Sequence, residues 1–197
     1  MEEIGTFEVK GDQLRVSDPC YERDTWCAGV IKKVLPGKWN AMVEMWSNDK
    51  THGWGERVAV LRVEHEDYTG RLLNKQMTYE DSGIDVGVDS GQCGIYDESR
   101  YQLDGKGEYG EDGTWYGEAC KCTHGKEDEF GRPLKGEPYF TAGILNLYGG
   151  PLGVVSSSGY GDGSYSCEVE RDPDGNAVAV TVTFLDDEED EEYEDEE

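Results

Sequence analysis

Hydrophobic and polar residues alternate along much of the chain, which is the pattern of β-strands with one buried face. In AVAVTVTF, residues 177–184, every second position is valine or phenylalanine. RVAVLRVEH at 57–65 and KWNAMVEMW at 38–46 alternate in the same way. Shorter alternating segments predict further strands at 5–9, 14–17, 29–35, 85–89, 115–123, 139–146 and 152–156.

Turn-forming residues separate these segments, and the clearest turn is RDPDGNA at 171–177. There Pro173 presets the backbone φ of a turn, and Gly175 accepts the positive φ that follows. Helical periodicity is weak, and the best short helix is 97–103, where Asp97 can cap the first turn. The chain therefore predicts a mostly β fold over residues 1–185: a single-domain antiparallel sandwich or barrel-like sheet with at most one or two short helices.

Acidic residues dominate the charge, with 44 aspartates and glutamates against 18 lysines and arginines and a net charge of −26. Eleven of these acids lie in residues 186–197, where self-repulsion and the lack of apolar side chains predict a disordered acidic C-terminal tail. The other 185 residues still hold 33 acids and a net charge of −15. Because nucleic-acid phosphates are bound by clustered lysine and arginine, we expect no direct binding to nucleic acid.

The start of the chain, MEEIGTFEVK, has neither the basic leader nor the apolar segment of a secretory signal. No run approaches the ~18 apolar residues that a membrane span requires. We therefore expect a cytoplasmic protein that does not bind membranes and whose six cysteines are reduced thiols.

Two glycine-rich stretches carry the candidate site: VDSGQCGIYD at 88–97 and SSGYGDGSY at 157–165. The second lacks the lysine and the following helix of a phosphate-binding loop, so a tight turn between strands is the favoured interpretation. Aspartates beside glycines usually form turns. Where such aspartates converge, their oxygens can bind a cation or another small ligand. On that hypothesis the ligand-binding residues are Asp18, Asp89, Gln92, Asp97, Ser158, Tyr160 and Asp162.

Together with SDPCY at 17–21, these stretches resemble the domain-of-unknown-function 4241 family, which is found in bacteria and their phages. The resemblance covers mainly residues 88–165. It implies no established activity, so no catalytic role is carried over. The positions that it marks as part of the family pattern are Asp89, Gly91, Asp97, Gly161, Asp162 and Gly163.

CKCTH places Cys120, Cys122 and His124 at alternate positions. On a strand they would face one side at steps of ~6.5 Å, whereas tetrahedral zinc prefers ligands that a turn brings together. Buried reduced cysteines are the favoured interpretation, and we expect neither metal nor cofactor. No G-x-S-x-G or H-E-x-x-H motif occurs, so no catalytic residue is predicted and an enzyme is disfavoured.

The function that these features favour is that of a non-enzymatic intracellular binding protein, which blocks or sequesters a basic protein partner as immunity and phage counter-defence proteins do. Two alternatives stay open. One is a small-ligand or cation-binding domain that uses the glycine-flanked aspartates. The other is a hydrolase that uses the same carboxylates as acid and base.

Overall fold

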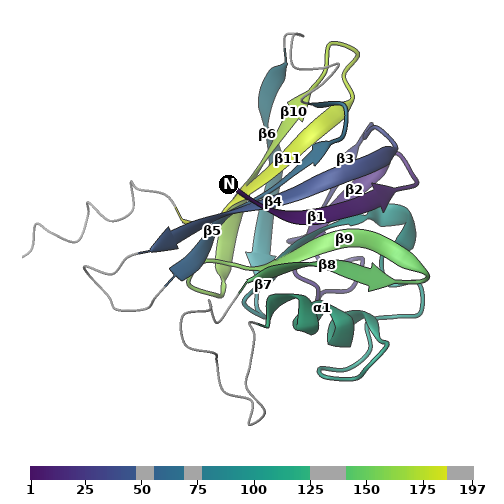
Figure 1. Cartoon of the computed structure of the whole chain (residues 1–197), viewed down its shortest axis with the longest axis vertical. Helices are drawn as coiled ribbons and strands as arrows, with labels where there is room; N and C mark the ends of the chain where they lie inside the picture. The colour runs from purple at the N-terminus through teal and green to yellow at the C-terminus, as the bar shows by residue number, and fades with distance from the viewer. Residues whose placement is uncertain (48–55, 69–76, 125–140, 186–197) are drawn as a thin grey trace, which may run out of the picture.

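The computed structural model describes residues 1–47, 56–68, 77–124 and 141–185, which form two antiparallel sheets packed face to face (Figure 1). The six-stranded sheet has the order β1 (Glu2–Val9), β4 (Gly37–Ser47), β5 (Glu56–His65), β11 (Ala177–Thr183), β10 (Gly163–Arg171) and β6 (Thr78–Val88). The five-stranded sheet has the order β3 (Gly29–Lys32), β2 (Gln13–Ser17), β7 (Gln92–Asp97), β9 (Gly150–Ser157) and β8 (Ala142–Leu147). Neither sheet closes into a barrel, so the prediction of a mostly β fold is confirmed in its sandwich form.

The main core lies between the two sheets and follows the alternation of the strands. Leu61, Val169 and Val182 enter it from the six-stranded sheet, and Val16 and Ile95 enter it from the five-stranded sheet. All five are at most 1% exposed. Burying a side chain of this size contributes about 1.5–3 kcal/mol, so the alternating residues fix which face of each strand turns inward.

Residues 115–123 form helix α1 (Trp115–Thr123), so the prediction of a strand there was wrong. The helix begins after Thr114, whose side-chain oxygen accepts a hydrogen bond from the N–H of Gly117 at 3.2 Å. Trp115, Ala119 and Thr123 are buried at a spacing of four residues, which is the stripe of a helix with one packed face. The alternation of Cys120 and Cys122 hid this longer period.

Helix α1 covers the outer face of the five-stranded sheet, below β7, β8 and β9 in Figure 1. A second buried cluster fills the space between them and includes Tyr96, Trp115, Leu145 and Val155. The five-stranded sheet is therefore covered on both faces. No helix in the described residues is long and apolar enough to cross a membrane.

The turn predicted at 171–177 is present, but only a single 3-10 turn, η2 (Glu98–Arg100), capped by Asp97, forms within the short helix predicted at 97–103. In the 171–177 turn, Gly175 has a φ of 81° and donates its N–H to the carbonyl of Asp172 at 2.9 Å. A strand, not a helix, follows the glycines at 159–163, which agrees with the turn interpretation. The predicted acidic tail at 186–197 lies outside the described residues, as do the first two residues of the strand predicted at 139–146.

Candidate functional site

The two glycine-rich stretches form turns that lie against each other. The β6–β7 turn covers residues 89–91, and the β9–β10 loop covers residues 158–162. The Gly91 N–H donates to the Asp162 carboxylate at 3.1 Å, and the Ser158 N–H donates to the Gly91 carbonyl at 3.1 Å. Gly91 has a φ of 68°, a conformation that glycine adopts without strain. The structure thus brings Asp89, Ser158 and Asp162 into one neighbourhood.

The side chain of Asp18 contacts the same turn, and all of its hydrogen-bonding capacity is taken by groups of the protein. Its fully buried carboxylate accepts hydrogen bonds at 2.7 to 2.9 Å from the N–H groups of Cys20, Asp89 and Ser90 and from the Ser90 hydroxyl. Four donors fill the lone pairs of a carboxylate. Asp18 therefore ties the β6–β7 turn to the end of β2 and offers no oxygen to a bound cation.

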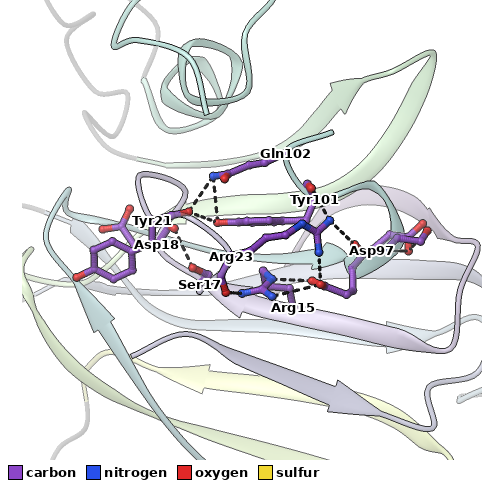
Figure 2. A network of polar contacts seen from close by, with 10 residues as sticks. Arg15, Ser17, Asp18, Tyr21, Arg23, Asp97, Tyr101 and Gln102 are labelled. Atoms are coloured by element: carbon purple, nitrogen blue, oxygen red, sulfur yellow. Dashed lines mark hydrogen bonds and ion pairs between the residues drawn. The ribbon is translucent and has the colours of Figure 1, made fainter. Parts of the chain in front are cut away.

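Asp97 lies elsewhere, because it pairs with Leu14 at the far end of β2 from Asp18 (Figure 2). Its buried carboxylate accepts hydrogen bonds from the Lys10 N–H at 3.1 Å, from Ser99, and from the Arg100 guanidinium at 2.8 Å. Burial acts to raise the pKa of Asp97, but these hydrogen bonds outweigh it and hold the pKa below its usual value. The four predicted aspartates therefore do not converge on one ligand.

A polar network joins the segment after β2 to the segment after β7 (Figure 2). Glu98 binds both Arg15, at 2.6 Å, and Arg23. The two guanidinium carbons lie 4.7 and 5.6 Å from the centre of the Tyr101 ring, and the Tyr101 hydroxyl donates to the Tyr21 carbonyl at 2.6 Å. These contacts satisfy the charges within the protein, so the network holds the fold and fixes the β2–β3 loop.

A cavity of about 440 Å³, which we call the α1 cavity, lies beside the two turns. It is bounded by α1, the start of β7, the end of β9 and the β9–β10 loop. This volume lies in the range of pockets that hold small molecules. Three tyrosines line it, Tyr109, Tyr116 and Tyr160. Of the predicted site residues, Gln92 and Tyr160 belong to this lining.

The inner end of the α1 cavity presents fixed polar groups. The Gln92 amide donates to the Thr123 hydroxyl, and its oxygen lies 3.8 Å from the Cys120 thiol. Ser157 pairs with Gln92 across the strands, so both side chains face α1. Ser157 is 5% exposed, and its hydroxyl has no hydrogen-bond partner within the described residues. Since buried hydroxyls are almost always paired, this oxygen points to a ligand atom or a water.

The charge of the α1 cavity is opposite to that of the whole chain. Arg57 and His124 line it, whereas no aspartate or glutamate does within the part of the chain that the structure describes. The Arg57 guanidinium donates to the Glu56 carbonyl at 3.0 Å. The His124 Nδ1 lies 2.5 Å from the Cys120 carbonyl oxygen and donates its hydrogen to it. In a chain of net charge −26, a cavity with this lining favours an anion.

Cys120, Cys122 and His124 do not face one another as metal ligands would. Cys120 turns toward Gln92, whereas the Cys122 thiol lies 3.4 Å from the Glu118 carbonyl inside the helix. Burial raises the pKa of Cys120 and raises that of Cys122 to about 12, so both stay protonated at neutral pH. Among the described residues, no group of three histidine, cysteine, aspartate or glutamate side chains could hold a metal ion.

A family model described as "Protein of unknown function (DUF4241)" matches residues 7–182, which is most of the chain. The chain belongs to the DUF4241 family. The predicted resemblance is confirmed, and the match extends well beyond residues 88–165 to include β1, β2, β4, β5 and β11. Comparisons with curated proteins and with solved structures find no match.

Sequence reasoning missed several residues of the α1 cavity in this DUF4241 chain, notably Arg57, Tyr116 and Ser157. Arg57 is the second residue of β5, and only the pairing of distant strands brings it to the β9–β10 loop. Tyr116 is on the segment that was predicted as a strand. The position of Ser157 could have been found from the sequence. It directly precedes the predicted site residue Ser158, and strand alternation places the side chains of these two neighbours on opposite faces.

Proposed function

We propose that this protein is a non-enzymatic binding protein that holds a small anion carrying a flat ring in the α1 cavity. The observation that supports it is the lining of that cavity, which combines Arg57 and three tyrosines with no carboxylate among the described residues. Tyrosine rings contact flat rings well, and a guanidinium binds carboxylate or phosphate with paired hydrogen bonds. The unpartnered Ser157 hydroxyl adds one specific polar contact.

The net negative charge of the protein does not prevent anion binding at this place. Exposed charges more than ~8 Å away are largely screened at physiological ionic strength. Arg57 itself belongs to the lining of the cavity, so its charge lies closer to a bound ligand than the distant carboxylates do. Local charge therefore decides which ligand enters, while the distant carboxylates mainly slow the approach of an anion.

The chemistry of the lining favours binding over catalysis. A serine nucleophile needs a base within hydrogen-bond reach, and the Ser157 hydroxyl has no such partner in the described residues. The Cys120 thiol is protonated at neutral pH, because burial raises its pKa. The glycine-flanked carboxylates that a hydrolase would use are either tied up, like Asp18, or directed at backbone N–H groups, like Asp162.

Calorimetry on the purified full chain tests this function. The probes are benzoate and adenosine monophosphate, with benzyl alcohol and adenosine as their neutral counterparts and inorganic phosphate as an anion without a ring. We expect saturable binding of a ring-bearing anion and at least about ten-fold weaker binding of its neutral counterpart, since one charge-assisted contact is lost. Equal affinity for charged and neutral probes, or no binding by any probe, contradicts the proposal.

As a second function, we propose that the acidic surface binds a basic protein partner in the cytoplasm of a bacterium, where an immunity or counter-defence protein of bacterial or phage origin would act. The net charge of −15 outside the acidic tail supports it, and so do six cysteines that are all free. Several cations are already neutralised within the fold, for example Arg15 by Glu98 and Arg62 by Glu170. A partner captured at low salt should be basic and should be lost when surface carboxylates are neutralised.

A further inference from the structure

Trp26 is the most exposed large apolar side chain in the described residues, at 90%. It lies in the β2–β3 loop, residues 18–28. Among the other described tryptophans, Trp39 and Trp115 are at most 1% exposed and Trp46 is half-buried, so Trp26 is the one described indole that lies largely in solvent. Tryptophan is also the residue type most enriched where proteins gain most of their binding energy.

The loop that carries Trp26 is held on both sides. Before it, Arg23 donates to the Tyr101 carbonyl at 2.6 Å, and Tyr101 in turn donates to the carbonyl of Tyr21 (Figure 2). After it, the Cys27 carbonyl accepts the N–H of Gly87 on β6 at 3.0 Å. The indole is therefore presented by a fixed backbone, which lowers the entropy cost of binding.

A hollow of about 280 Å³, which we call the Trp26 hollow, lies between this indole and the β6–β7 turn. Asp89 is the one charged residue among the described residues that line it. Tyr21 lines the same hollow, and burial is the main cause that raises the pKa of its phenol. The phenol therefore keeps its proton, and Asp89 supplies the negative charge of the hollow that it shares with the indole.

An indole and a carboxylate that line the same hollow are suited to a guanidinium group. The cation can stack on the ring while its N–H groups bind the carboxylate. Glu22 and Asp24, both exposed on the same loop, add negative charge around the hollow. Arg23, the cation of this loop, is held by Glu98 and does not occupy the hollow's lining.

We propose that the Trp26 hollow is the docking point for an arginine side chain of a basic protein partner, with Trp26 and Asp89 as the two contacting residues. This inference rests on the second proposed function and specifies the surface that performs it. It is independent of the α1 cavity, whose lining shares no residue with the Trp26 hollow.

The test uses fluorescence anisotropy of a labelled peptide of Gly-Arg repeats, titrated with the full chain at low salt. Trp26→Ala and Asp89→Asn should each weaken binding by about three- to ten-fold, and a Gly-Lys peptide should bind more weakly than the Gly-Arg peptide. Asp24→Asn is the matched control, because it removes one charge from the same loop without touching the hollow. Tyr79→Ala removes another exposed aromatic ring, on β6, and should leave binding unchanged.

The outcomes separate this inference from the function on which it rests. If the peptide binds and none of the variants differs from Asp24→Asn, the docking point is wrong while charge-driven partner binding survives. If the peptide does not bind at all, both are wrong. If Trp26→Ala instead turns a dimer into a monomer in analytical ultracentrifugation, the indole contacts a second copy of this chain, and the arginine assignment is overturned.

Discussion

The α1 cavity and the Trp26 hollow lie on opposite sides of the β6–β7 turn and have opposite polarity. Ser90 and Gly91 line the α1 cavity together with Arg57, whereas Asp89 lines the Trp26 hollow together with an exposed indole. Within the three consecutive residues 89–91, the first therefore lines a site suited to a cation, and the next two line a site suited to an anion. The comparison teaches that net charge describes the approach of a ligand, while the few groups at contact distance determine which ligand binds.

The largest effect is expected where the two sites share a support, at Asp18. Asp18→Ala should lower the free energy of unfolding by at least about 3 kcal/mol, because it removes four hydrogen bonds to a fully buried carboxylate, and a hydrogen bond to a charged group contributes about 1.5–3 kcal/mol. Urea denaturation measures this change, and binding at both sites should weaken with it. Asp162→Ala removes one exposed carboxylate, which lies in the β9–β10 loop and accepts a hydrogen bond from the same turn, and should cost about 1 kcal/mol or less. Equal stability of the two variants would contradict the central role of Asp18.

Asp97 separates stability from binding, since it lies away from both sites. Asp97→Asn should lower the free energy of unfolding by about 2–3 kcal/mol at neutral pH, because the buried Arg100 loses its carboxylate partner. The pKa of Asp97 is held below 3.8, so its contribution is complete above that value and is lost as the pH falls through the lower, folded-state pKa. The difference between variant and wild type should therefore shrink only below pH 3.8, as the carboxylate of Asp97 takes up its proton in the folded protein. At neutral pH we expect Asp97→Asn to leave the affinities for the anion and for the peptide unchanged. A loss of either affinity would contradict the conclusion that Asp97 affects stability and not binding.

Arg57 distinguishes the two sites directly. Arg57→Gln should weaken binding of the ring-bearing anion by about ten-fold or more and leave the Gly-Arg peptide unaffected, because Arg57 lines the α1 cavity and does not line the Trp26 hollow. Arg171→Gln removes an arginine that binds Glu80 outside that cavity and serves as the control. Calorimetry with the anion and anisotropy with the peptide give both numbers. An equal loss of anion affinity in the two variants would mean that only the total charge matters.

The smallest effect concerns one hydroxyl. Ser157→Ala should weaken anion binding by about three-fold, which corresponds to a single hydrogen bond. Ser156→Ala removes a second buried hydroxyl that also has no partner within the described residues. Because Ser156 pairs with Cys93 and faces the core between the sheets, its removal should leave the affinity unchanged. Calorimetry on the two variants decides whether the Ser157 oxygen contacts the ligand.

The strands could be predicted because burial of one face imposes alternation, as in β5; β11 is buried on both faces, and its alternation is of valine with alanine and threonine. Helix α1 could not be recognised from CKCTH, whose alternation imitates a strand. Two features of the sequence indicate the helix. Trp115, Ala119 and Thr123 recur at a spacing of four residues, and Thr114 can cap the first turn, but both are seen only when more residues than CKCTH are considered together. Asp97 was correctly expected to cap a turn. Because its carboxylate binds the groups of that turn, it does not take part in a shared ligand site.

The candidate site was predicted in part, because glycine turns between neighbouring strands bring their flanking residues together. Gln92 and Tyr160 line the α1 cavity, and Ser158 and Asp162 hold its loop in place. Arg57 and Trp26 could not be assigned in this way. Their positions depend on the order and register of strands that are far apart in the sequence, which no local pattern specifies.

The β6–β7 turn is exposed, yet each of its three backbone N–H groups donates to an aspartate carboxylate: Asp89 and Ser90 to Asp18, and Gly91 to Asp162. A surface turn usually exchanges its amide hydrogens with solvent quickly, since its backbone opens at little cost. Here each opening breaks a charge-assisted bond, so these three amides should exchange as slowly as those of the adjoining strands. Such a rigid turn between the two proposed ligand sites should keep them thermodynamically independent, so that filling one leaves the affinity of the other unaltered.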